Sequence, residues 1–234
     1  MNQAEGIVLR NINYSNTSKI IYVLTEHGID SLLVKGAQTH KSKLRFLTQP
    51  MSLISFNKSR SKNLPILISG DITNSYANIH KDLKKQSYGL WIAEIIYKLS
   101  TDIDFSKLYN YTKIVYSKLD NTKHTELISF SFMLKYLYLL GLNPVFSHCV
   151  DCSSKNISGF DVSKGGMVCI EHSTSNSIAD KEVLDSLYDL YYLDISNYEN
   201  FKFNKLMIFQ IINRYYEYHI NFRSKTAEVL RNLL

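Results

Sequence analysis

All three cysteines of the chain lie in one short segment, together with a histidine at a matching position. Cys149 and Cys152 form a Cys-x-x-Cys pair, and Cys169 and His172 form a Cys-x-x-His pair. Each pair suits a tight turn that directs two ligand atoms at one point, and together they supply the tetrahedral nitrogen and sulfur set that Zn²⁺ prefers. Four protein ligands leave no open coordination position, so we expect one structural zinc ion in a knuckle at 149–172.

Two other interpretations of these residues are less favoured. A disulfide would pair two cysteines and strand the third, and nothing else in the chain suggests an oxidising compartment. His148 could replace His172 as a ligand, but its position next to the first cysteine breaks the paired spacing.

Within the loop, Gly159, Gly165 and Gly166 are expected to supply the positive-φ turns that a short ribbon needs.

Length and composition are those of a folded protein. The chain has 234 residues, of which 45% are hydrophobic and 21% are charged, and it contains only three prolines. This length accommodates two small domains, each with its own core. The start, Met1-Asn2-Gln3-Ala4-Glu5, lacks the basic and apolar regions of a signal peptide, and no apolar run approaches the roughly 18 residues of a membrane span. We expect a cytoplasmic protein without a membrane partner.

Positive charge is concentrated in the N-terminal third. The formal net charge is +6, and the stretch from Ser31 to Gly70 contains no Asp or Glu. The cations of this stretch are Lys35, Lys41, Lys43, Arg45, Lys58, Arg60 and Lys62. Such a surface indicates an anionic partner and suits contacts with phosphates, although charged loops are also common as simply solvated surface.

Hydrophobic periodicity predicts a strand-rich part followed by a helical part. Strands are expected at 7–9, 20–24, 32–34, 53–56 and 66–68. Five short strands in a small basic region predict a closed barrel, for which the oligonucleotide-binding (OB) fold is preferred over an SH3-like barrel. We therefore assign residues 1–76 to an OB-fold nucleic-acid-binding domain.

Beyond residue 76 the spacing becomes helical. Tyr88, Trp91, Ile92 and Ile95 share one face of a helix that begins near Asp82. Further helices are expected at 106–119, 125–140, 203–220 and 224–234, with another that begins after Asp180 and continues to about residue 191. The fold class is therefore α+β multidomain, with a helical domain at 77–234 that carries the zinc knuckle.

The sequence shows no catalytic constellation. The cysteines are assigned to the metal, and the remaining histidines are scattered without a companion nucleophile or base. No glycine-rich phosphate loop of the G-x-x-x-x-G-K-[ST] or G-x-G-x-x-G type occurs. We predict a binding protein rather than an enzyme.

Short motifs along nearly the whole chain occur in the same order as in one known family. They are Glu5-Gly6-Ile7-Val8-Leu9-Arg10, Leu24-Thr25-Glu26-His27-Gly28, Val34-Lys35-Gly36-Ala37 with Lys41-Ser42-Lys43-Leu44, Gln49-Pro50, Leu139-Leu140-Gly141-Leu142-Asn143-Pro144, Gly159-Phe160, Gly165-Gly166 and Ser224-Lys225-Thr226-Ala227-Glu228-Val229-Leu230. In this order, and with the knuckle, they resemble the bacterial RecO family of DNA repair proteins. Two departures are Tyr14-Ser15-Asn16, where the family commonly has Gly-Glu after the Tyr, and His172, where it commonly has a fourth cysteine.

The resemblance implies a recombination mediator that binds single- and double-stranded DNA and anneals complementary strands. It also implies action with RecR and the single-stranded-DNA-binding protein, and indirectly with RecA. Carried over to this sequence, phosphate contacts are expected at Lys35, Lys41, Lys43 and Arg45, with Arg10, Lys58, Arg60 and Lys62 as further candidates. Two alternatives are an RNA-binding OB-fold protein, which the basic barrel alone would equally allow, and a protein-docking scaffold.

Overall fold

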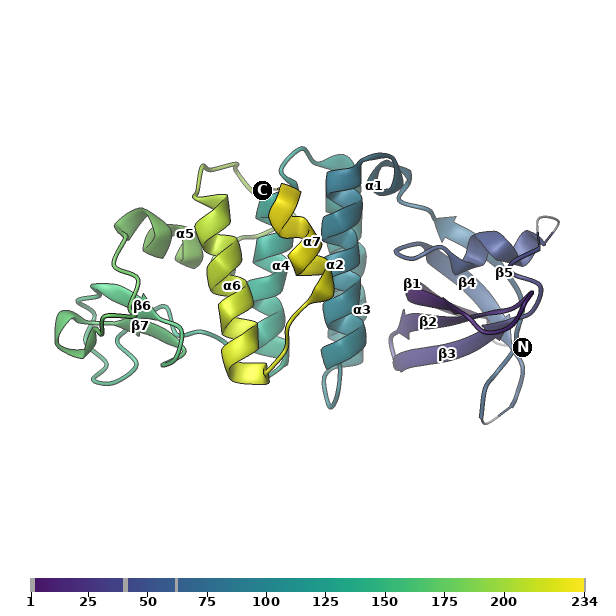
Figure 1. Cartoon of the computed structure of the whole chain (residues 1–234), viewed down its shortest axis with the longest axis horizontal. Coiled ribbons are helices and arrows are strands. Elements are labelled where there is room, and N and C mark those ends of the chain that lie inside the picture. The colour runs from purple at the N-terminus through teal and green to yellow at the C-terminus, as the bar shows by residue number, and fades with distance from the viewer. Residues whose placement is uncertain (1–2, 40–41, 62, 234) are drawn as a thin grey trace. The chain divides into compact units, whose positions relative to one another are not determined.

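A computed structural model describes residues 3–39, 42–61 and 63–233 (Figure 1). The chain divides into two compact units, Met1–Thr122 and Lys123–Leu234. The first unit continues beyond residue 76, because two long helices at 83–99 and 105–121 pack against the N-terminal sheet and a short helix at 77–81 packs against those two.

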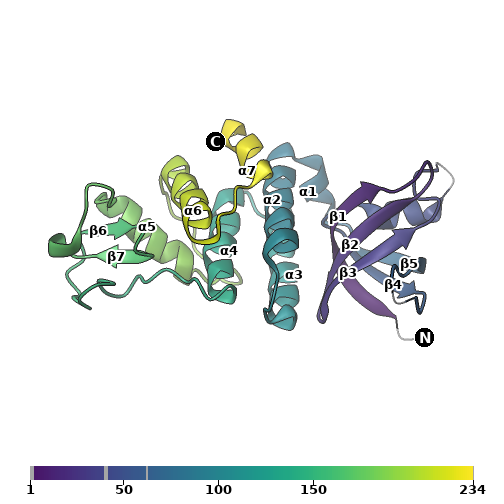
Figure 2. The same ribbon diagram turned by 60° about the horizontal axis from the view of Figure 1, so that its bottom comes forward.

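The first unit begins with a five-stranded antiparallel sheet (Figures 1 and 2). Its strands are β1 (Ala4–Asn13), β2 (Lys19–Thr25), β3 (Gly28–Val34), β4 (Leu53–Lys58) and β5 (Leu67–Asn74). The strand order is β3-β2-β1-β4-β5, and the two hairpins β2-β3 and β4-β5 flank β1. All five predicted strands are present, so the expected OB-like sheet followed by a helical region is confirmed.

The sheet is not closed by a continuous ladder in the part of the chain that the structure describes. Between its edge strands, the described residues form one isolated parallel bridge, from Leu33 to Ile66. There the Leu33 backbone N–H donates to the Pro65 carbonyl at 2.9 Å. Because proline has no N–H, Pro65 cannot return a hydrogen bond to β3. The predicted closed barrel is therefore corrected to an OB-like sheet whose edge strands, as far as the structure describes them, share one isolated bridge instead of a ladder.

The core of the sheet follows the alternation of apolar and polar residues along each strand. Buried side chains from all five strands form one cluster, with Val8, Ile21, Val23, Leu32, Val34, Ile54, Phe56 and Leu67 among its members. Each fully buried side chain of this kind contributes about 1.5–3 kcal/mol relative to exposure. In this unit two elements were absent from the sequence prediction, the 3-10 helix η1 (Lys43–Thr48) and the short helix α1 (Ala77–Lys81).

Two long helices, α2 (Leu83–Leu99) and α3 (Phe105–Asn121), complete the first unit. Trp91 is fully buried on α2, as its spacing predicted. The helices contact the sheet through aromatic and charged groups. The Tyr22 ring on β2 lies 4.7 Å from the Tyr97 ring on α2. The Glu5 carboxylate accepts hydrogen bonds from the Tyr109 hydroxyl at 2.6 Å and from the Lys113 ammonium at 2.8 Å.

The N-terminus of α2 provides a testable contribution to stability. The Asp82 side chain accepts hydrogen bonds from the backbone N–H groups of Lys84 and Lys85. We expect Asp82→Ala to lower the free energy of unfolding of the first unit by about 1 kcal/mol, whereas Asp82→Asn retains most of the cap. Urea denaturation followed by the fluorescence of Trp91, the single tryptophan of the chain, measures this unit separately. Equal losses in both variants would contradict the capping role.

The second unit is built from helices and a small ribbon. Its elements are α4 (Thr125–Leu139), β6 (Gly159–Asp161), β7 (Gly166–Val168), η2 (Ile170–His172), α5 (Lys181–Tyr192), α6 (Lys205–Ile220), α7 (Lys225–Leu230) and η3 (Arg231–Leu233). Helix α4 is buried along most of its length, and the Tyr216 hydroxyl on α6 donates to the Met133 carbonyl at 2.8 Å. Gly141 adopts φ 70° directly after this helix, as expected for a helix end.

The predicted helix starts in this unit are largely confirmed. The side chains of Asp180 and Ser224 accept backbone hydrogen bonds at the first turns of α5 and α7. Helix α6 begins at Lys205, two residues later than predicted, because the Asn204 side chain caps it by accepting from the Met207 N–H. Among the described residues, no helix has both the length and the apolar character that a membrane crossing requires.

Candidate functional site

The two predicted ligand pairs come together at the ribbon of the second unit. One ligand atom from each of Cys149, Cys152, Cys169 and His172 lies within 4.8 Å of the others. The Sγ atoms of Cys152 and Cys169 are 3.7 Å apart. The Nδ1 atom of His172 lies 3.2 Å from the Cys169 Sγ and 3.8 Å from the Cys149 Sγ.

These separations fit a tetrahedral metal site. With metal–sulfur and metal–nitrogen bonds typical of zinc, the edges of the tetrahedron are about 3.8 Å between two sulfurs and about 3.6 Å between sulfur and nitrogen. The separation between the Cys152 and Cys169 sulfurs matches this edge and far exceeds the roughly 2.05 Å of a disulfide bond. His148 is not part of the group, and its Nδ1 lies 2.8 Å from the Ser147 hydroxyl instead. The residues therefore fit a metal such as zinc.

The ribbon positions the ligands through its backbone. Strands β6 and β7 pair antiparallel. The Val150 N–H donates to the Met167 carbonyl at 3.0 Å, which connects the turn between Cys149 and Cys152 to β7. Cys149 and Cys169 are buried around Val168, whereas Cys152 is exposed. Two ligands thus anchor the site in a small apolar core.

The prediction holds for one of the three loop glycines. Gly165 has a positive φ, at 75°, whereas the expectation of positive φ at Gly159 and Gly166 is wrong. Both of these lie in the extended ribbon, and at Gly166 it is space rather than backbone angle that excludes a side chain. A Cβ on Gly166 would lie 2.6 Å from the Val145 carbonyl oxygen. Glycine is therefore needed there for the close approach of two backbones.

Electrostatic contacts around the ligands were not predicted from the sequence. Burial raises the pKa of the Cys149 thiol, but hydrogen bonds from the backbone N–H groups of Cys169, Asp151 and Cys152 outweigh it and lower this pKa to about 6. A hydrogen bond with His172 lowers the pKa of Cys169. Both effects favour the thiolate, which is the form that binds metals. In the sequence, the only signal for these hydrogen bonds to the cysteine sulfurs was the Cys-x-x-Cys turn itself.

Lys164 links the turn that carries Cys149 and Cys152 to the turn that carries Cys169 and His172. Its ammonium lies 2.5 Å from an Asp151 carboxylate oxygen in the first turn and donates to the His172 carbonyl oxygen at 3.0 Å in the second. The Asp151 carboxylate, as the largest cause, raises the pKa of Lys164, so the lysine keeps its charge. This cation offsets part of the negative charge that thiolate ligands bring to the site.

The predicted phosphate-contacting residues that the structure describes lie on several elements of the first unit. Lys35 follows β3, Lys43 and Arg45 lie on η1, and all three are exposed. Arg60 is exposed in the connection between β4 and β5. Lys41 and Lys62 lie outside the described residues.

Arg10 and Lys58 make side-chain contacts within the first unit. The Arg10 guanidinium lies over the Tyr97 ring at 5.4 Å. The Lys58 ammonium pairs with the Asp30 carboxylate at 2.5 Å. Both side chains therefore have structural partners in addition to any ligand.

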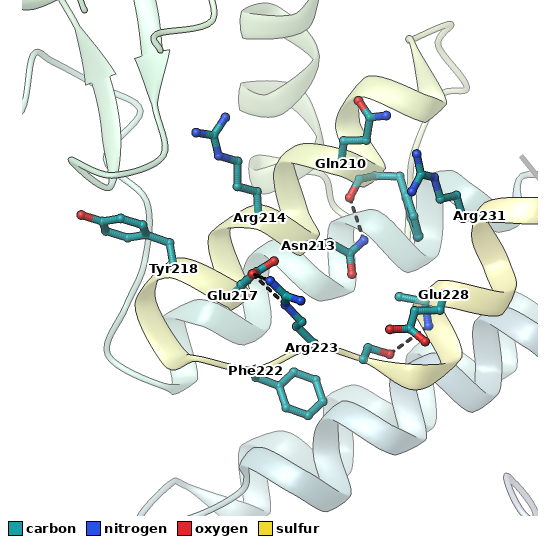
Figure 3. A pocket seen from close by; sticks show the side chains of 12 residues that line it. Gln210, Asn213, Arg214, Glu217, Tyr218, Phe222, Arg223, Glu228 and Arg231 are labelled. Carbon is teal, nitrogen blue, oxygen red and sulfur yellow. Dashed lines mark hydrogen bonds and ion pairs between the residues drawn. The ribbon is translucent and has the colours of Figure 1, made fainter.

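A cavity of about 600 Å³ runs along α6 and α7 (Figure 3). Arginine and glutamate side chains share its wall, and Arg223 forms an ion pair with Glu217 there. The Asn213 side chain donates to the Phe209 carbonyl of its own helix at 2.8 Å. This mixture does not present a single sign of charge to a ligand.

Comparison with known proteins decides the family. The family model "Recombination protein O N terminal" matches residues 1–76, and "Recombination protein O C terminal" matches residues 80–228. The chain belongs to the RecO family. The DNA repair protein RecO of Bacillus subtilis (strain 168) is 29% identical over 98% of this chain and 94% of its own length. DNA repair protein RecO of Bacillus velezensis is also 29% identical, over 100% of this chain and 98% of its own length.

Membership in the RecO family confirms the resemblance drawn from the order of the motifs. It assigns the chain to a family of recombination mediators in DNA repair. The boundary between the two family matches falls close to the end of β5, so the OB-like sheet corresponds to the N-terminal match.

Proposed function

We propose that this chain is a RecO recombination mediator that binds single- and double-stranded DNA and anneals complementary strands. In this role it helps load RecA onto single-stranded DNA coated by the single-stranded-DNA-binding protein, acting with RecR in the cytoplasm at the nucleoid. The observation that carries the proposal is that both halves of the chain match the RecO family. The acid-free stretch from Ser31 to Gly70, which exposes Lys35, Lys43 and Arg45, supports the DNA-binding part.

The chemistry of DNA binding follows from charge. Cations that neutralise phosphates release condensed counterions, so affinity falls as salt concentration rises and depends little on base sequence. A basic surface that holds two strands also lowers their mutual repulsion and raises their local concentration. Annealing by this route needs no nucleotide and no catalytic group.

We further propose that the four ligand residues hold one structural Zn²⁺. Three thiolates and one imidazole fill a tetrahedral shell, which leaves no position for water or substrate. The ion supplies cross-linking of the ribbon. Lys164 holds the His172 backbone in place, and backbone N–H groups bond to the Cys149 sulfur, so both ligands are oriented by the chain itself.

The salt dependence of binding tests the DNA-contacting surface. We expect Lys43→Ala/Arg45→Ala to weaken binding to a single-stranded oligonucleotide about tenfold at low salt. The slope of log affinity against log salt should become shallower by about 1.4, which corresponds to two lost phosphate contacts. Fluorescence anisotropy across a salt series measures both quantities.

A matched control separates the surface from net charge. Lys155→Ala/Lys181→Ala removes the same charge from exposed positions in the second unit and should leave the slope unchanged. If wild type and Lys43→Ala/Arg45→Ala had equal slopes of log affinity against log salt, the DNA contacts would lie elsewhere on the protein. Tighter binding to RNA than to DNA of the same sequence would contradict a mediator acting on DNA.

A further inference from the structure

One exposed face of the second unit concentrates tyrosines. Tyr188 and Tyr192 on α5 and Tyr138 on α4 are 46%, 55% and 62% exposed. The Tyr192 ring lies 4.6 Å from the Tyr188 ring and 5.0 Å from the Tyr191 ring. Burial, and then the neighbouring Tyr192 and Tyr138 phenols, raise the pKa of Tyr191 on the same helix. Exposed large aromatic side chains grouped in this way are typical of protein interfaces.

Carboxylates accompany these tyrosines on α5. Asp185, Tyr188, Asp189 and Tyr192 follow the i, i+3, i+4, i+7 spacing that places residues on one helix face, and all four are exposed. Burial, and then the nearby Asp185 carboxylate, raise the pKa of Asp189, so negative charge is crowded on this face. The chain as a whole carries a formal net charge of +6, and the α5 face is therefore opposite in sign to the protein.

A cavity of about 360 Å³ lies beside the same face. Its wall includes Phe146, Ile157 and Met167 from the ribbon region and Lys181, Leu184, Asp185 and Tyr188 from α5. Asp185 and Tyr188 belong both to the wall of this cavity and to the exposed face of α5, so the cavity and the face are continuous. The ribbon that holds the metal ligands provides one side of it.

We propose that this face, formed by Asp185, Tyr188, Asp189 and Tyr192 with the adjacent cavity, docks a segment of a partner protein that presents an apolar side chain flanked by arginine or lysine. The apolar side chain fills the recess between ribbon and α5. Guanidinium or ammonium groups pair with the two carboxylates and lie over the tyrosine rings. Crowded negative charge repels phosphates, so the surface selects a basic protein segment over nucleic acid.

Selection from a random displayed peptide library against the full, metal-loaded chain tests this assignment. We expect enriched peptides to combine an apolar residue with neighbouring Arg or Lys. Their affinity, measured by fluorescence anisotropy, should fall about tenfold or more in Asp185→Lys and in Tyr192→Ala. Glu199→Lys makes the same charge change at an exposed position outside this face and should leave affinity unchanged. Metal content and DNA affinity, equal in all variants, verify that each is folded.

Three results would overturn the proposal. The first is that the library yields no peptide whose binding depends on Asp185 and Tyr192. The second is enrichment of peptides without basic residues. The third is displacement of a bound peptide by a single-stranded oligonucleotide in the Lys43→Ala/Arg45→Ala variant, which would assign the face to nucleic acid. Because these readouts do not require DNA binding by the sheet, the inference can fail while the mediator function stands.

Discussion

Replacing Cys149 by serine is expected to abolish stoichiometric metal binding and to unfold the ribbon of the second unit. Cys149 is fully buried, and its sulfur accepts backbone hydrogen bonds in addition to its proposed place in the metal shell. Structural zinc in small ribbons contributes about 10–16 kcal/mol of binding free energy, which the strands β6 and β7, three residues each, cannot replace. Metal content by mass spectrometry and backbone amide spectra of residues 145–178 measure the two effects.

The histidines of the same segment provide a matched control. His172→Ala removes a proposed ligand and should also release the metal, whereas His148→Ala should retain it. The fluorescence of Trp91 reports the first unit alone, and we expect its unfolding transition to be unchanged in every one of these variants. Full metal retention by Cys149→Ser, or metal loss in His148→Ala, would contradict the ligand assignment.

Asp161 is the second residue whose removal should have a large effect. Its carboxylate is almost fully buried, and one oxygen accepts from the Ser163 N–H at 2.9 Å and the Ser163 hydroxyl at 2.6 Å. The other oxygen accepts from the Thr174 hydroxyl at 2.9 Å and the Ser177 hydroxyl at 3.0 Å. We expect Asp161→Ala to lower the free energy of unfolding by about 2–4 kcal/mol, because a buried carboxylate and the hydrogen bonds that it accepts are lost. Urea denaturation followed by circular dichroism measures this loss.

The same carboxylate predicts a pH dependence. Burial raises the pKa of Asp161, but hydrogen bonds from Ser163, Thr174 and Ser177 outweigh it and lower the pKa to about 2. A folded-state pKa below the ordinary value means that the stabilisation is fully present above about pH 4 and is lost as the pH falls towards 2. The stability difference between wild type and Asp161→Asn should therefore shrink over this range. A difference that stays constant would contradict an ionised Asp161.

Local rules account for the elements that the sequence predicted well. The helix starts at Asp82 and Asp180 follow from short side chains that accept backbone hydrogen bonds. The metal group was predictable because ligand spacing alone brings each pair to a turn. Trp91 was placed in the core by helical periodicity, which reflects burial directly.

The remaining features depend on contacts between distant residues. Gly166 is required by the Val145 backbone, which approaches it from outside the hairpin, so its φ could not be inferred from the turn sequence. The pairing of Lys58 with Asp30 joins two strands that are not adjacent in the sheet. The tyrosine and carboxylate face of α5 was not predicted, because its exposure depends on which side of the helix packs against α4 and the ribbon.

The annealing of two complementary oligonucleotides, one fluorescent and one carrying a quencher, is the decisive assay for the proposed mediator function. We expect this chain to accelerate their annealing without any nucleotide, and we expect Lys43→Ala/Arg45→Ala to accelerate it less than Lys155→Ala/Lys181→Ala does. Tight binding to single-stranded DNA with no acceleration would contradict a mediator that brings strands together.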